Sequence, residues 1–402
     1  MTNVADQAWK HLYQLCVAIG PRPIGSTENL EATHYIQDHI QKNGLQVEEQ
    51  TFDCPIWDHQ GTHLLLDGEE LRVGANGFSP SCDVTRTAVS FGTLSTLEQA
   101  DLKGHIAILY GDLTKGTGYP TRGAIYYPEQ ELKVIQLLEE KAPAALILVH
   151  SKIGSSERLM RDWSFQIPSV SVPLEVGLRL LNHPEGVIHL SVQASLTPGK
   201  VRNLIATLPG EKPERLILCA HFDSVVDCPG AVDNGAGTAA LLALAEVFAS
   251  RWLPLTLEFA ALNGEENGGL GDVVYLSQRG DSLGNALAVI NMDGIGNHAS
   301  VNSITMLGES QPFHDLVCGL HQKYPGMAWV APWRESDHYA FFSRGVPAVA
   351  FSSVSVDRIV HNSTDTVEWV SPARLGEVVA MVSEILEALQ DKNPGWTRKP
   401  VG

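Results

Sequence analysis

Residues that can bind a metal or move a proton follow four apolar runs in the second half of the sequence. Run 215–220 is followed by His221 and Asp223, and run 255–262 by Glu265 and Glu266. Run 286–292 is followed by Asp293, and run 346–352 is followed a few residues later by His361. A further acid, Asp233, lies in the glycine-rich segment 229–237, just ahead of a predicted helix. Because ligands of open α/β sheets bind at the carboxyl ends of the strands, we expect these side chains to converge on one place.

Imidazole nitrogens combined with carboxylate oxygens form a donor set typical of zinc, whereas an all-oxygen set would indicate magnesium or calcium. The two imidazoles and the four carboxylates of Asp233, Glu265, Glu266 and Asp293 exceed the needs of one tetrahedral site. We therefore expect two divalent ions, with zinc favoured, that share one carboxylate and use two histidines and three acids, which leaves one glutamate free for acid/base work. The adjacent Glu265 and Glu266 fit this division, because neighbouring side chains of an extended segment point opposite ways.

The elements that must position these residues are predicted to form an α/β fold. From Val201 onward, long apolar strands alternate with helices, which is typical of a mainly parallel twisted sheet flanked by helices. Before it, the periodicity predicts helices over 9–18 and 28–43, followed by a strand. Near the end, Ser371 caps a strongly amphipathic helix, and the tail from Asp391 is expected to be frayed.

The stretch from 54 to 199 has a different sequence pattern from the regions on either side of it. It consists of short β-like runs separated by turn residues, with one predicted helix at 129–141. We interpret it as a mixed α+β domain inserted into the catalytic domain. The predicted division is therefore a catalytic domain over 1–53 and 200–395 with an inserted domain over 54–199.

Composition narrows the classes of partner. The chain has 402 residues with 46 acidic against 28 basic side chains, a net charge of −18, which argues against nucleic acid and against an anionic membrane as the main partner. The first twenty residues have no basic segment followed by an unbroken apolar run, and no stretch is long and apolar enough to span a bilayer. We expect a soluble, cytoplasmic protein.

Six segments resemble the di-zinc exopeptidase family, which includes bacterial leucyl aminopeptidases and vacuolar aminopeptidase Y. They are HFDS (221–224), PGAVDNGAG (229–237), NGEENGGLG (263–271), NMDGIG (291–296), SDHYAF (336–341) and HNSTDT (361–366). The opening IGPRPIGSTEN (19–29) is also similar to that family. The inserted domain resembles a protease-associated domain through DLKGHIAIL and IPSVSVPLEVGLRLL.

The resemblance implies a role for each site residue, carried over position by position. His221, Asp233 and Asp293 would bind one metal ion, and Asp233, Glu266 and His361 the other, with Asp233 bridging. Glu265 would be the general base and Asp223 would orient His221. The resemblance places Asp337 beside the site rather than on a metal, and His338 has no assigned role.

The function implied is that of a metal-dependent aminopeptidase acting on peptides with a free N-terminus. A carboxypeptidase or dipeptidase of the same fold would need a cationic pocket, for which Arg334 is the candidate. A glutaminyl cyclase would be expected to work with one metal ion. A non-catalytic, receptor-like protein is disfavoured, because no expected ligand or base is replaced in this sequence.

Overall fold

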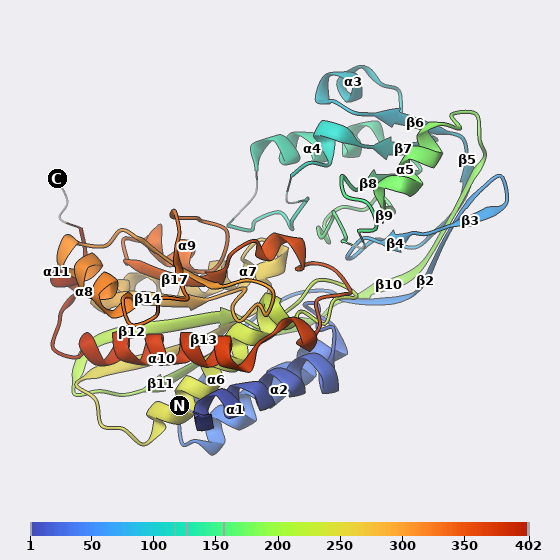
Figure 1. Ribbon diagram of the computed structural model, residues 1–402. Coiled ribbons are helices and arrows are strands. Elements are labelled where there is room, and N and C mark those ends of the chain that lie inside the picture. The colour runs from blue at the N-terminus through green and yellow to red at the C-terminus, as the bar shows by residue number, and fades with distance from the viewer. Residues whose placement is uncertain (1, 117, 126–127, 156, 400–402) are drawn as a thin grey trace. The chain divides into compact units, whose positions relative to one another are not determined.

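The computed structural model describes residues 2–116, 118–125, 128–155 and 157–399. The chain divides into two compact units (Figure 1). Unit 1 combines Met1–Phe52 with Val201–Gly402, and unit 2 is Asp53–Lys200. Among the described residues, none of the helices has the length and apolar character needed to cross a membrane.

Unit 1 is built on one large sheet with the strand order β1-β11-β13-β12-β14-β17-β15-β16. The strands are β1 (Gln46–Asp53), β11 (Lys200–Leu208), β12 (Lys212–His221), β13 (Leu255–Leu262), β14 (Ala286–Met292), β15 (Asn302–Leu307), β16 (Ala328–Trp329) and β17 (Ala348–Ser353). Neighbours in the central group β13, β12, β14 and β17 are parallel, whereas β11 and β15 pair antiparallel with β13 and β17. The predicted α/β class with a mainly parallel sheet is confirmed.

Helices cover both faces of this sheet. They are α1 (Thr2–Tyr13), α2 (Thr27–Lys42), α6 (Ala236–Ala249), α7 (Leu270–Arg279), α8 (Gln311–His321), α9 (His338–Phe342), α10 (Pro372–Ala388) and α11 (Pro394–Thr397). Figure 1 shows α1, α2, α6 and α10 together on one face, with α7 and α9 on the opposite face. Helix α6 is apolar and buried nearly all round, which explains why it can lie between the sheet and the outer helices.

Side-chain caps fix the starts of two helices that the sequence predicts. The Ser26 hydroxyl accepts a hydrogen bond from the backbone N–H of Asn29 at 3.0 Å, so α2 begins directly after it. The Ser371 hydroxyl accepts from the N–H of Arg374 at 3.4 Å, and Pro372 occupies the first turn of α10. These caps satisfy backbone donors that have no partner inside the helix.

The prediction of a frayed tail from Asp391 is wrong for the described part of that segment. Helix α11 packs on unit 1, and the buried Thr397 hydroxyl donates to the carbonyl of Leu287 at 2.7 Å. The guanidinium of Arg398 donates to the carbonyls of Leu283 and Ala286 at 2.7 and 3.0 Å. The polar composition of the tail suggested exposure, but these long-range contacts anchor it, and they have no local sequence signature.

Unit 2 contains two sheets, with the strand orders β3-β2-β10-β5 and β4-β9-β8-β7-β6. Its strands are β2 (Ile56–Leu66), β3 (Glu69–Leu71), β4 (Gly74–Ala75), β5 (Cys82–Arg86), β6 (Ala88–Phe91), β7 (Ile106–Leu109), β8 (Ala145–Val149), β9 (Ser169–Val172) and β10 (Ile188–Thr197). Its helices are α3 (Leu94–Gln99), α4 (Glu129–Lys141) and α5 (Leu174–Leu181). The unit is of mixed α and β content, and its assignment as a protease-associated domain stays a prediction.

Candidate metal centre

Three parallel neighbours in unit 1 bring their following loops to one edge of the sheet. Strand β12 ends at His221, which lies opposite Leu262, the last residue of β13. On the other side of β12, Cys219 lies opposite Asn291 near the end of β14. The loops that carry Glu265 and Asp293 therefore begin beside His221, as expected for the carboxyl ends of parallel strands.

Asp233 lies between the two histidines of this edge. Its Oδ1 is 3.2 Å from His221 Nε2, and its Oδ2 is 3.2 Å from His361 Nε2. A second acid approaches each ring, because Asp293 Oδ1 is 3.4 Å from His221 Nε2 and Glu266 Oε2 is 3.2 Å from His361 Nε2. The structure thus brings five of the predicted residues into two groups of three that share Asp233, which we call the strand-end cluster.

The strand-end cluster fits divalent metal ions. Within each group of three, one ligand atom per residue lies within 4.8 Å of the others. The His221 ring is fully buried, and within the described residues neither of its nitrogens has a hydrogen-bond partner of acceptable geometry, although carboxylate oxygens lie close. Burying an imidazole in this way is costly unless a ligand satisfies it. The donors are nitrogen and carboxylate oxygen, the mixture that zinc accepts.

Asp223 holds the loop that carries the two glutamates. Its Oδ1 accepts hydrogen bonds from the backbone N–H groups of Gly264 at 2.8 Å and Glu265 at 3.3 Å, and its Oδ2 accepts from Glu266 at 3.3 Å. The same Oδ1 lies 3.6 Å from His221 Nδ1. One buried carboxylate therefore positions the loop and faces the back of the imidazole, a wider role than the sequence predicts.

Asp365 is a positioning residue that the sequence reasoning missed. It is fully buried, and its two oxygens accept hydrogen bonds from the backbone N–H groups of Val232 at 2.8 Å and Asp233 at 3.1 Å. Burial raises its pKa to about 7, although these hydrogen bonds favour the charged form. Its place in the segment HNSTDT was a possible signal, but nothing in that segment indicates a contact reaching 132 residues back along the chain.

Glu265 lies beside the strand-end cluster with its side chain partly exposed to solvent. Its Oε2 is 3.9 Å from His221 Nε2, and its side chain is 19% exposed, whereas the Glu266 side chain is 3% exposed. Burial, opposed by His221 but reinforced by the carboxylates of Asp293 and Glu266, raises the pKa of Glu265 well above its usual value. A carboxyl group with a raised pKa and access to substrate is suited to taking up a proton and returning it.

The charges of the other members follow from their neighbours. Burial opposes a charged His221, but the carboxylates of Asp293, Asp223 and Asp233 outweigh it and raise the pKa of the imidazole well above its usual value. Burial likewise opposes a charged Asp233, while the imidazoles of His221 and His361 lower its pKa far below the usual range. Opposite charges therefore meet at the Asp233 carboxylate, which faces both imidazoles.

Three residues at the start of α9 or just before it lie outside the two groups of three. Asp337 is buried, and burial together with the neighbouring carboxyl of Asp272 on α7 raises its pKa well above the usual value. His338 Nδ1 lies 3.3 Å from the amide nitrogen of Asn291, and its Nε2 lies 3.0 Å from the Trp333 carbonyl. Arg334 is exposed, with its guanidinium 5.7 Å from the centre of the Tyr339 ring. Asp272 was not among the residues predicted from the sequence.

Comparisons with known proteins support the family that the motifs indicate. Residues 203–386 match the sequence model of Peptidase family M28. Aminopeptidase YwaD of Bacillus subtilis is 25% identical over 98% of this chain and 87% of its own length. The exopeptidase family inferred from the motifs is confirmed.

Two solved structures share the fold. The zinc aminopeptidase BSAP of Bacillus subtilis has a TM-score of 0.76 and 24% identity, covering 96% of this chain and 95% of that one. The aminopeptidase of Aneurinibacillus sp. strain AM-1 has a TM-score of 0.74 and 23% identity, covering 99% of this chain and 96% of that one.

Proposed function

Because residues 203–386 belong to peptidase family M28, we propose that the protein is a metal-dependent aminopeptidase with two zinc ions at the strand-end cluster. The observation that carries this proposal is the placement of Asp233, whose two oxygens face two histidines that each have a second acid alongside. This arrangement supports one ion on His221, Asp233 and Asp293, and the other on Asp233, Glu266 and His361. Such a pair, when bound, would polarise the scissile carbonyl and lower the pKa of the attacking water, so that this water loses a proton more readily.

Glu265 is proposed as the general base. Its position at the open side of the cluster, 3.9 Å from His221 Nε2, lets its carboxylate take a proton from the attacking water. The protonated carboxyl then donates that proton to the leaving amine, so the group returns to its starting state. The environment that raises its pKa favours the protonated form that this second step needs.

Asp223 and Asp365 are proposed to hold the site in shape without touching substrate. Asp223 fixes the backbone of residues 264–266 and faces the imidazole of His221, and Asp365 fixes the backbone at Asp233. Keeping these backbones in place keeps Glu265 and the bridging carboxylate at their working distances.

Removal of N-terminal residues is favoured over removal of C-terminal ones. Aminopeptidase YwaD, which this chain matches over 98% of its length, supports this choice by its name. Arg334 keeps a carboxypeptidase or dipeptidase as the alternative, and glutaminyl cyclisation is a second one. Residues 54–199 are proposed to be a protease-associated-like domain, with a cytoplasmic location for the protein.

A panel of matched peptides tests the proposal. Each peptide is supplied with a free, an N-acetylated and a C-amidated terminus, and zinc content is measured on the same samples. We expect release of the first residue from free and C-amidated peptides, no cleavage of acetylated ones, and loss of activity after zinc is removed by a chelator. Trimming of acetylated peptides from the C-terminus, cyclisation of N-terminal glutamine, or full activity without metal would contradict it.

A further inference from the structure

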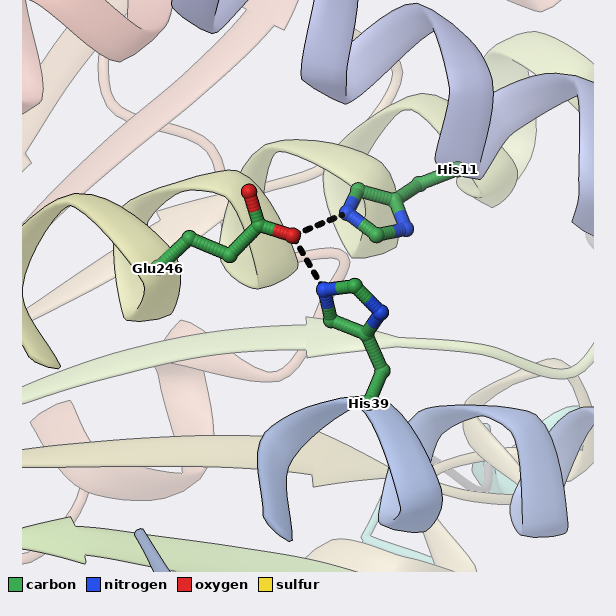
Figure 2. A group of neighbouring side chains, drawn as sticks. All are labelled: His11, His39 and Glu246. Carbon is green, nitrogen blue, oxygen red and sulfur yellow. Dashed lines mark hydrogen bonds and ion pairs between the residues drawn. The ribbon is translucent and has the colours of Figure 1, made fainter. Parts of the chain in front are cut away.

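A second group of metal-ligating side chains lies among the helices of unit 1 (Figure 2). His11 comes from α1, His39 from α2 and Glu246 from α6, and we call these three residues the helix cluster. Both rings point their Nε2 atoms at the same carboxylate oxygen, Oε1 of Glu246. The His11 contact is 3.1 Å long, and the His39 contact is shorter.

The helix cluster is enclosed on one side and open on the other. The His11 side chain is 4% exposed and that of Glu246 is 14% exposed, whereas that of His39 is 25% exposed. The two rings meet edge to face, with centroids 4.2 Å apart. Packing therefore fixes the directions of the nitrogens, and the exposed side of His39 leaves a route for an ion and a water molecule from solvent.

The other nitrogen of His11 already has a partner. Its Nδ1 lies 2.7 Å from the hydroxyl of Tyr35, which is also on α2. If Nδ1 carries the ring proton and donates it to that hydroxyl, Nε2 presents its lone pair toward Glu246, which is how metal-bound histidines are usually oriented.

We propose that His11, His39 and Glu246 form a second metal site, separate from the strand-end cluster, that binds a zinc-like divalent ion. Its donors are two imidazole nitrogens and one carboxylate, with ligand atoms within 4.8 Å of one another, and water from the open side completes a tetrahedral shell. Glu246 lies ten residues beyond Ala236, the start of α6 next to Asp233, a separation of about 15 Å along the helix.

The position of this site gives it a structural role. One ion would join α1, α2 and α6, whose ligands are 28 and 207 residues apart in sequence, and would bind the folded chain far better than the unfolded one. A ligand with that preference raises the free energy of unfolding. The site would therefore stabilise the helical layer without contributing to peptide hydrolysis.

Zinc binding to two variants tests the proposal. The full chain, His39→Ala and Glu246→Gln are stripped of metal and dialysed against a buffer of fixed free zinc, and zinc per chain is then measured. We expect each variant to retain about one zinc ion fewer per chain than the unmodified protein. Added zinc should raise the Tm of the unmodified protein more than that of either variant, while the peptidase rate of both variants stays unchanged.

The matched control is His34→Ala, because His34 is exposed on the same helix α2 and lies outside the cluster. It should keep the full zinc content. Glu246→Gln preserves the shape of the side chain, and it keeps the test decisive if His39→Ala folds poorly, as judged by circular dichroism in chelator. Equal zinc content in the unmodified protein and Glu246→Gln would overturn the proposal and leave a hydrogen-bonded His-Glu-His group.

Discussion

The strand-end cluster and the helix cluster combine the same donor types but hold them in different ways. At the strand ends, buried carboxylates of Asp223 and Asp365 accept hydrogen bonds from loop N–H groups, so the backbone itself is fixed around the ligands. In the helix cluster, the backbone N–H groups are hydrogen-bonded within the helices. Side-chain contacts, such as that between the Tyr35 hydroxyl and His11, orient the metal-ligating atoms instead. The strand-end cluster is therefore held through its loop backbone, and the helix cluster through side-chain contacts on packed helices.

Asp233→Ala should produce the largest effect and separate the two clusters most clearly. Removing the bridging carboxylate deprives both proposed catalytic ions of a ligand, so we expect peptidase activity to be lost and zinc content to fall by about two ions per chain. Elemental analysis and a peptide assay on the same samples measure both. An ion in the helix cluster should remain, and adding His39→Ala to this variant should remove it.

The control for this variant is Asp281→Ala, at an exposed acid of the same unit. It should keep both activity and zinc. Substantial peptidase activity in Asp233→Ala would refute the bridging role.

Glu265→Gln should leave zinc in both clusters and still abolish useful turnover. The carboxamide keeps the shape of the side chain but cannot take a proton, so we expect kcat to fall by about 10²- to 10⁴-fold with little change in KM. Steady-state kinetics with zinc analysis checks this. Glu211→Gln, at an exposed position, is the matched control. A kcat within a few fold of the unmodified enzyme would exclude Glu265 as the base.

Asp223→Asn should have a smaller effect confined to the strand-end cluster. An amide offers one acceptor oxygen where the carboxylate accepts three backbone hydrogen bonds, and its NH₂ group would face N–H donors. We expect zinc affinity at the strand-end cluster to fall by about 10- to 100-fold, measured by competition with a chelator of known affinity. Asp38→Asn on the exposed side of α2 is the control. Unchanged zinc affinity would mean that Asp223 only shapes the loop.

The sequence predicted the fold class and the elements around the site because both depend on local patterns. Apolar runs and turn residues located the strands, and the Ser371 cap marked where α10 begins. The prediction for the tail after Asp391 was wrong because that segment is held by long-range hydrogen bonds, such as the one that Thr397 donates to the carbonyl of Leu287. The identity of residues 54–199 as a protease-associated domain rests on sequence resemblance and remains a prediction.

For the candidate site, the sequence by itself determined which residues can bind metal and that several of them follow strands, because side-chain chemistry and strand periodicity are local properties. The roles given to Glu265 and to each ligand remain proposals that the variants above test. Only the tertiary structure decided that Asp365 holds the backbone at Asp233, that Asp272 lies beside Asp337, and that three helices bring His11, His39 and Glu246 together. Those contacts join elements that are far apart in the sequence. The spacing of residues along the chain does not reveal how such elements pack against one another.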